Sequence, residues 1–352
     1  MQHDVEFRGQ AGAYFGIWIV NIVLTVLTLG IYSAWAKVRT RRYFYGNTFI
    51  DGAAFDYHAR PLQILIGRII VVAALTVYVI LSGLLPLVAA VLALIYLGLV
   101  PYLVSRGLRF DRRVTSYRNV RFDFVGGYGG AFWSFILLPF LNIFTLFLAT
   151  PFVTRQISHY VTRNTRYGDR PIEAQMPVGG LYGVFGVTVL LVLLTAGSLV
   201  AVMAAAVPGL FTGEVSPAEL EFLMAQDPRL AVLPFLAIPI YLLFIIAALA
   251  YFVVGRNALM NAMVLDRIHR FRSSVSITRF SWITISNFLV CVVTLALMIP
   301  WARIRVTRYM CDQTKLIAGG PLDAYAAEVK QSSGVVGAEF MDLEGVDVGA
   351  AF

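Results

Sequence analysis

The chain has 352 residues, of which 59% are hydrophobic and only 14% charged, and its mean hydropathy is +0.76. Soluble domains carry charge on about a quarter of their residues, so this composition excludes an ordinary soluble protein and predicts an integral membrane protein. The formal net charge is +8, and only three of the 28 cations are lysine. Arginine suits planar contacts with phosphate and carboxylate. We therefore expect the bilayer and its anionic phospholipid headgroups as partners, and no nucleic acid.

Six apolar runs are long enough for a membrane helix, which needs about 20 residues. In chain order they are 14–35, 64–104, 131–152, 181–210, 231–254 and 280–301. The second run is long enough for two helices, and Pro86 after Ser82 and Gly83 marks the natural break between them. The hydropathy pattern therefore predicts seven apolar segments.

The charged connectors bear on how many of these segments cross the membrane. Positive charge is retained on the cytoplasmic side, yet every connector is basic except the acidic 212–229. If only 64–104 and 181–254 cross, with 212–229 outside, all basic connectors and the C-terminus lie in the cytoplasm, and the other three segments are re-entrant or bent. If all seven segments cross, the charge rule is obeyed only weakly. The sequence leaves both arrangements open.

The three segments that would be re-entrant resemble one another. Residues 17–48 and 283–314 share twelve identities in 32 positions at a fixed offset of 266. The shared residues include an asparagine, a threonine, a tryptophan and two arginines: Asn21, Thr28, Trp35, Arg39 and Arg42 recur as Asn287, Thr294, Trp301, Arg305 and Arg308. A middle copy, at an offset of 117, keeps the threonine as Thr145 and has His159 in place of the second arginine. The pattern predicts a threefold internal repeat.

The repeated aromatic and basic residues have two interpretations. Their spacing of three and four places them on one helix face, where an interfacial tryptophan lies beside guanidinium groups at the depth of lipid phosphates. In the first interpretation the three copies form one anionic ligand-binding site from Trp35, Arg39, Arg42, His159, Trp301, Arg305 and Arg308. In the second, these residues only anchor helices at the membrane surface.

Polar residues inside the apolar segments are also open to two interpretations. A buried amide such as Asn21 or Asn287 needs a partner, and threonines can bend a helix by bonding to its carbonyls. Asn21, Thr28, Thr145, Asn287 and Thr294 therefore either line a polar path or pack between helices.

The remaining connectors contain extended and acidic stretches. Asp51-Gly52 predicts a turn before a strand-like 55–57, and basic extended stretches occupy 117–122 and 267–271. The tail from Pro321 holds six acids and one lysine. We expect it to dock onto the cytoplasmic arginines or onto a protein partner, or else to be disordered.

Together these patterns predict an all-α polytopic membrane protein in which three internal repeats alternate with two transmembrane helical hairpins. The expected organisation is repeat 1 with a basic flank (1–60), a hairpin (61–105), repeat 2 (106–180), a hairpin with an acidic external loop (181–254), repeat 3 (255–320) and an acidic tail (321–352).

Three stretches carry a resemblance to a known family. They read NIVLTVLTLGIYSAWAKVRTRRYFYGNTFIDGAAFDYHARPLQILIGR, RGLRFDRRVTSYRNVRFDFVGGYGGAF and TLALMIPWARIRVTRY. The chain resembles the YjgN-like family of bacterial inner-membrane proteins over nearly its whole length. The resemblance implies a multi-pass inner-membrane protein of a Gram-negative bacterium, and it implies no reaction.

The sequence offers little for catalysis. The four histidines lack metal-ligand spacing, and no carboxylate lies within the apolar runs, which disfavours an ion-coupled transporter. We therefore expect a non-enzymatic protein without metal or cofactor. The first hypothesis is a transporter or channel-like protein for an anionic solute or lipid. The alternative is a scaffold or regulatory protein that docks anionic lipid and a protein partner.

Overall fold

The computed structural model describes residues 1–207 and 238–343, together with scattered positions between 208 and 237. Ten short antiparallel strands close into a barrel in the order β1-β10-β9-β8-β7-β6-β5-β4-β3-β2, so the prediction of an all-α protein is wrong. The strands are β1 (Gln2–Phe7), β2 (Thr48–Ile50), β3 (Ala53–Tyr57), β4 (Thr115–Tyr117), β5 (Val120–Phe124), β6 (Thr165–Tyr167), β7 (Arg170–Ala174), β8 (Met263–Leu265), β9 (His269–Ser273) and β10 (Thr314–Ile317).

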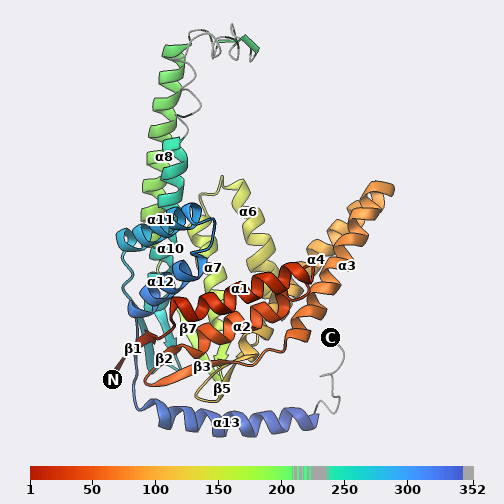
Figure 1. Cartoon of the computed structure of the whole chain (residues 1–352), viewed down its shortest axis with the longest axis vertical. Helices are drawn as coiled ribbons and strands as arrows, with labels where there is room; N and C mark the ends of the chain where they lie inside the picture. Colours follow the sequence, from red (N-terminus) through yellow and green to blue (C-terminus); the bar gives the residue numbers. More distant parts are fainter. Residues whose placement is uncertain are drawn as a thin grey trace.

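Helix pairs connect the strands at one end of the barrel, which we call the helix rim (Figure 1). They are α1 (Ala11–Leu27) with α2 (Ser33–Gly46), α3 (Pro61–Leu84) with α4 (Pro86–Arg113), α5 (Tyr128–Phe132), η1 (Trp133–Leu137) and α6 (Leu138–Phe144) with α7 (Thr150–Arg163), α8 (Gly179–Ala206) with α10 (Ile238–Ala262), and α11 (Ile277–Val293) with α12 (Ile299–Asp312). Short turns join β2 to β3, β4 to β5, β6 to β7 and β8 to β9 at the opposite end, the turn rim. Because neighbouring strands are antiparallel, every helix pair leaves and re-enters the barrel at the same rim.

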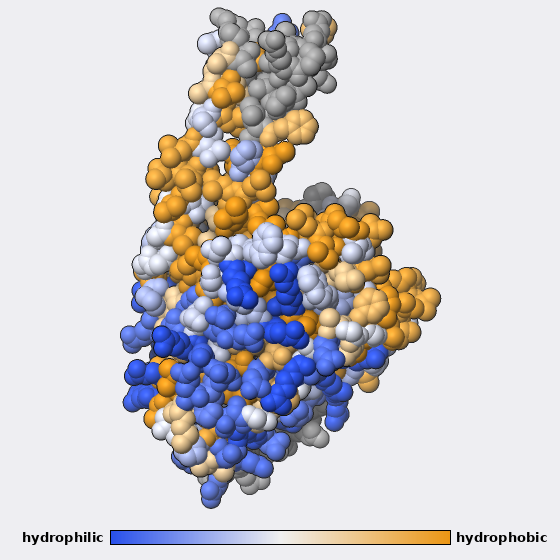
Figure 2. All heavy atoms as spheres, turned by 60° about the vertical axis from the view of Figure 1, so that its left-hand side comes forward, coloured by the Kyte–Doolittle hydropathy of each residue, from blue (hydrophilic) through white to orange (hydrophobic). Residues whose placement is uncertain are grey.

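The helices differ in length. Four of them, Pro61–Leu84, Leu87–Arg113, Gly179–Ala205 and Ile238–Ala262, are long and apolar enough to cross a membrane. Three shorter apolar helices, Ala11–Leu27, Tyr128–Phe144 and Ile277–Val293, span only about 25 Å at 1.5 Å per residue, less than the roughly 30 Å hydrocarbon core. The helical columns present an apolar surface, whereas the barrel end is hydrophilic (Figure 2).

The three shorter helices end in tight turns that carry apolar residues at their tips. Leu29, Leu146 and Leu295 have positive φ values of 49°, 50° and 48° and are 95%, 82% and 87% exposed. In each turn a threonine hydroxyl bonds to a carbonyl of the helix that is ending and accepts from a backbone N–H at the start of the next helix. The turn satisfies its own polar groups, so its leucine tip is suited to contact lipid.

The junction from helix to strand also follows from the sequence. The first residue of four strands is a threonine whose hydroxyl donates to the carbonyl four residues earlier, at distances of 2.7–2.9 Å. These residues are Thr48, Thr115, Thr165 and Thr314. The hydroxyl satisfies a carbonyl at the end of the helix, and the β-branched side chain favours the strand that begins there.

Helix α13 (Leu322–Leu343) lies across the turn rim (Figure 1). Its residues Leu322, Tyr325, Ala326 and Val329, spaced as one helix face, are buried in the cluster that fills this end of the barrel. Burying a single leucine or valine side chain stabilises by roughly 1.5–3 kcal/mol. This apolar face therefore contributes most of the docking energy.

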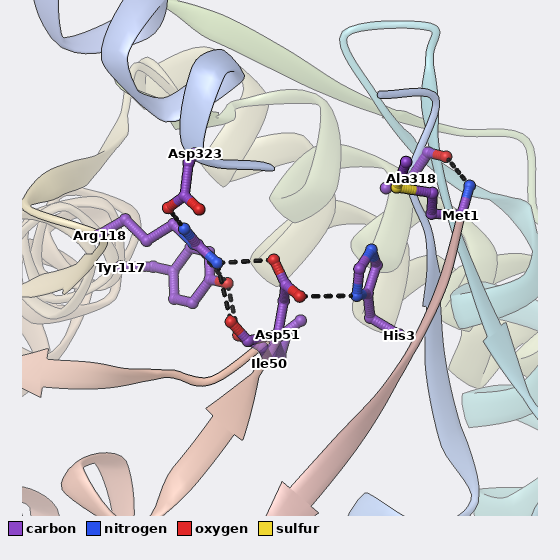
Figure 3. Close-up of polar contacts among 8 residues, drawn as sticks. All are labelled: Met1, His3, Ile50, Asp51, Tyr117, Arg118, Ala318 and Asp323. Carbon is purple, nitrogen blue, oxygen red and sulfur yellow. Dashed lines mark hydrogen bonds and ion pairs between the residues drawn. The ribbon is translucent and has the colours of Figure 1, made fainter. Parts of the chain in front are cut away.

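Ion pairs add to the docking of α13. Arg118, in the turn between β4 and β5, pairs with Asp323 of α13 and lies 2.7 Å from Oδ2 of Asp51 (Figure 3). The other carboxylate oxygen of Asp51, Oδ1, lies 3.0 Å from Nδ1 of His3. Arg170 pairs with Glu328 of α13 at 2.9 Å. Both acidic side chains on α13 are largely exposed, and exposed pairs contribute only about 0–1 kcal/mol each. The ion pairs therefore determine where α13 docks on the barrel, but they contribute little to the free energy of docking.

The two ends of the strand sequence meet beside α13. The amino group of Met1 donates to the carbonyl of Ala318 at 2.7 Å (Figure 3), and β1 pairs with β10. The barrel therefore closes only when residues more than 300 positions apart come together.

Candidate functional site

Three of the predicted ligand-binding residues line one pocket. Trp301, Arg305 and Arg308 project from α12 into a cavity of about 480 Å³. Arg279 and Trp282 of α11 and Ala11 of α1 complete much of its wall. We call this cavity the arginine pocket.

The contacts of these side chains hold the guanidinium groups in place. Arg305 donates to Ser286 Oγ at 2.7 Å and to Asn287 Oδ1 at 3.0 Å, and its guanidinium lies 5.2 Å from the centre of the Trp301 ring. Arg308 donates to the carbonyl of Gly9 at 2.9 Å. Each arginine keeps further N–H donors, because a guanidinium has five.

The charge of the pocket favours an anion. Arg279 is exposed, packs over the ring of Tyr309 and lines the cavity. Asp312 also lines the cavity. Among the described residues, however, no carboxylate oxygen lies within 4 Å of a guanidinium nitrogen of Arg279, Arg305 or Arg308. Three guanidinium groups against one carboxylate can hold a phosphate or a carboxylate by charge-assisted hydrogen bonds.

The other predicted ligand-binding residues lie elsewhere on the helix rim. Arg39 of α2 donates to Tyr32 Oη at 3.0 Å, Trp35 stacks on Tyr32, and Arg42 donates to the carbonyls of Tyr57 and Ala59. In the middle pair, Nδ1 of His159 lies 3.1 Å from the carbonyl of Ala174. The structure does not bring the three copies into one site, because α2, α7 and α12 belong to different helix pairs around the barrel (Figure 1).

Arg42, His159 and Arg308 share a local role with two residues from the long helix pairs. Each of the five lies within hydrogen-bonding distance, at 2.9–3.3 Å, of a carbonyl in the last residue of a strand or two residues after it, where the chain leads into the next helix pair. The five residues are Arg42, Arg109, His159, Asn257 and Arg308. These side chains link each helix pair to its neighbour. This shared structural role explains why the residues recur at matching positions of the repeats, and no shared ligand is needed.

The predicted path-lining or packing residues bond within the helix pairs. Asn287 is buried, donates to the carbonyl of Ala302 at 3.2 Å and accepts from Arg305. Asn21 is buried in the same way beside the carbonyl of Ala36 and Arg39. The threonines Thr28, Thr145 and Thr294 bond within the turns described above.

Sequence reasoning missed Arg279 and Trp282. They precede the repeated motif and lie on the first helix of the pair, where one tryptophan and one arginine among apolar residues look like an ordinary anchor. A search for basic residues at both ends of one helical hairpin would have indicated Arg279 and its neighbour Trp282.

A model of the family described as bacterial protein of unknown function (DUF898) matches residues 2–343. The chain belongs to this family. It is 34% identical over 140 residues to the inner membrane protein YjgN of Escherichia coli (strain K12), and this match covers 40% of the chain and 35% of that relative. It is 31% identical over 150 residues to the inner membrane protein YjgN of Salmonella typhimurium, covering 42% of the chain and 37% of the relative.

These matches span little more than a third of the length of the curated relatives. No solved structure matches the chain. The relatives' names and the apolar helices together support an inner-membrane location and an integral membrane protein.

Proposed function

We propose that this chain is a non-enzymatic, multi-pass inner-membrane protein that binds the headgroup of an anionic phospholipid in the arginine pocket. The observation that carries the proposal is the joint presence of Arg279, Arg305 and Arg308 with Trp282 and Trp301 in one cavity. Tryptophan is enriched at membrane–water interfaces, and arginine is the side chain that best matches phosphate.

The connectivity supports one orientation of the molecule. Every helix pair begins and ends at the helix rim, so the barrel lies on a single side of the bilayer. Its strands and turns carry many arginines, among them Arg118, Arg121, Arg166, Arg270 and Arg272, and arginine is retained in the cytoplasm. We therefore place the barrel and α13 in the cytoplasm, with four crossings and three re-entrant pairs. The acidic connector 212–229, expected outside, lies mostly beyond the described residues.

Docking of lipid is better supported than passage of a solute. A channel lined by Asn21, Asn287 and the turn threonines needs those groups to face water. Their contacts are instead to helix carbonyls and to arginines between packed helices. This packing favours the scaffold or regulatory role over transport, and the three short helix pairs then act as repeated membrane insertions.

Lipid selectivity tests the proposal. The purified protein is placed in nanodiscs of phosphatidylcholine with or without phosphatidylglycerol, and native mass spectrometry after release into mild detergent counts retained lipids. We expect phosphatidylglycerol to be retained by the wild type and lost on Arg279→Gln and on Arg279→Gln/Arg308→Gln. The matched control is Arg270→Gln, an exposed arginine of β9. Equal retention in all variants, or equal retention of both lipids, would contradict the proposal.

A further inference from the structure

The barrel encloses a second cavity, distinct from the arginine pocket. It has a volume of about 370 Å³, within the range of about 300–1,000 Å³ typical of small-molecule sites. Inward-facing side chains of the strands, such as Phe55, Phe122, Phe271 and Leu316, give it a largely apolar wall. We call this cavity the barrel chamber.

The width of the barrel explains why side chains do not fill the chamber. An eight-stranded barrel has an interior that side chains just fill or that holds one small ligand. Ten strands make a wider interior, so a cavity remains even though aromatic residues such as Tyr117 and Tyr167 pack on each other inside it. Atoms that line an apolar cavity have no dispersion partner on the cavity side, and an apolar ligand would supply those contacts.

The two ends of the chamber differ. At the turn rim, Leu322 and Tyr325 of α13 cover it. At the helix rim its wall includes Tyr45 of α2, Val161 of α7 and Leu259 of α10. Of these three helices, α10 is long and apolar enough to cross a membrane. The chamber therefore lies between the helices of the helix rim and α13.

Two polar atoms in the chamber lack partners. Nε of Arg112, at the end of α4, and Nε2 of His269, on β9, are buried without a hydrogen bond among the described residues. His269 is 1% exposed. Buried polar groups in folded proteins are nearly always hydrogen-bonded, so the unpartnered Nε of Arg112 inside a cavity indicates a ligand that carries a hydrogen-bond acceptor.

Arg112 and His269 lie on opposite sides and at different ends of the barrel. Arg112 precedes β4 at the helix rim, and His269 begins β9 near the turn rim and packs against Tyr325 of α13. Arginine is always charged, so the anion-binding end of the chamber is at Arg112, toward the membrane. We propose that the barrel chamber binds a single-chain anionic amphiphile, with its carboxylate or phosphate head at Arg112 and its alkyl chain among the aromatic side chains.

Photo-crosslinking of the full-length protein tests this proposal. The probe is palmitic acid with a diazirine midway along its chain, added to protein in phosphatidylcholine nanodiscs, and peptide mass spectrometry maps the adducts. We expect adducts on β5, β9 or β10 that unlabelled palmitate competes away. Adducts confined to the lipid-facing surfaces of α3, α4, α8 and α10 would overturn the proposal.

Two variants separate chamber binding from general partition into the bilayer. Arg112→Gln should raise the half-saturating probe concentration about tenfold or more, the effect of losing one charge-assisted hydrogen bond. The matched control is Arg113→Gln, because the neighbouring Arg113 is exposed and pairs with Asp123 outside the chamber. If Arg112→Gln does not fold, Leu316→Trp, which fills the chamber, should abolish the β-strand adducts. Unchanged β-strand adducts in a folded Leu316→Trp protein would contradict binding in the barrel chamber.

Further comparisons identify the head group and keep this inference apart from the phospholipid proposal. A neutral methyl ester of the probe should crosslink weakly. Unlabelled lysophosphatidic acid, which has a phosphate, and unlabelled palmitate, which has a carboxylate, are compared as competitors of the probe. The stronger competitor identifies the head group that the chamber prefers. The Arg279→Gln/Arg308→Gln variant should retain the chamber adducts, so failure of the arginine pocket would leave this inference standing.

Discussion

Val329 of α13 packs over Gly168, in the turn between β6 and β7, so closely that a Cβ added at Gly168 would lie 2.5 Å from Val329 Cγ1. Gly168 has a φ of +60°, in the left-handed region that favours glycine. The turn and the covering helix therefore both require glycine at this position.

Gly168→Ala should loosen α13 from the turn rim. The added methyl group clashes with Val329, and overpacking of this kind costs about 1–3 kcal/mol. We expect faster amide hydrogen exchange across 322–329, with the membrane helices unchanged. Gly46→Ala is the control, since a Cβ there meets no atom within 4 Å. Slow exchange in the Gly168→Ala protein would show that α13 docks by other contacts.

Asn287→Ala should destabilise the protein more than Phe288→Ala, although phenylalanine loses more apolar surface. Asn287 is buried and bonds to both Ala302 and Arg305, and leaving such partners unsatisfied costs about 1–3 kcal/mol. Phe288 is 67% exposed. Thermal unfolding in one detergent measures the order of the two variants. The reverse order would mean that Asn287 does not join α11 to α12.

Stability should fall as the pH is lowered from about 7 to 5. Burial lowers the pKa of His269, the N-terminal ammonium lowers it further, and Asp266 opposes both. The unfolded histidine, with a pKa of about 6.5, takes up a proton that the folded one resists, so acid favours the unfolded state.

The His269→Gln variant should flatten this pH dependence in thermal unfolding measured across the same range. Glutamine cannot take up the proton, and its side-chain oxygen can still accept from the backbone N–H of Gly319, as His269 Nδ1 does. His58→Gln, at an exposed position, serves as the control and should keep the wild-type slope. If His269→Gln retains the full slope, another group is responsible.

Cysteine labelling should place both ends of the first short helix pair, and the start of the third, on one side of the membrane. In a chain with Cys291 and Cys311 replaced by serine, single cysteines at Gly12, Gly46, Ser274 and Gly213 are treated with an impermeant maleimide on intact spheroplasts. We expect only Gly213 to label, because the other three positions adjoin the barrel. Labelling of Gly12 or Gly46, one without the other, would show that the first pair crosses the membrane once.

Several local features could be read from the sequence. The break at Pro86 is confirmed, since α3 ends at Leu84 and α4 begins at Pro86. The turn at Asp51-Gly52 is confirmed by φ values of 48° and 74°. In both cases the residue itself restricts the backbone, so the outcome does not depend on distant contacts.

The barrel could not be read in the same way. A strand such as Thr115–Tyr117 has only three residues, too few to show an alternating pattern. It is stable only because β3 pairs with one edge and β5 with the other. Basic extended stretches were visible, but their closure into a ring was not.

The predicted site shows the same division. The matching positions of Arg42, His159 and Arg308 in the three repeats were visible in the sequence. In the structure these side chains make contacts between neighbouring helix pairs instead of forming one ligand site. Of the predicted site residues, Arg305 and Arg308 share a cavity with Arg279, an arginine from another helix.

The sequence by itself determined that this is a membrane protein with seven apolar segments, because hydropathy and segment length are properties of contiguous residues. Only the tertiary structure decided that the helix pairs leave one rim of a barrel, that α13 covers the other, and that a chamber lies between. Those features depend on hydrogen bonds and packing between residues as far apart as Met1 and Ala318, which no local pattern encodes.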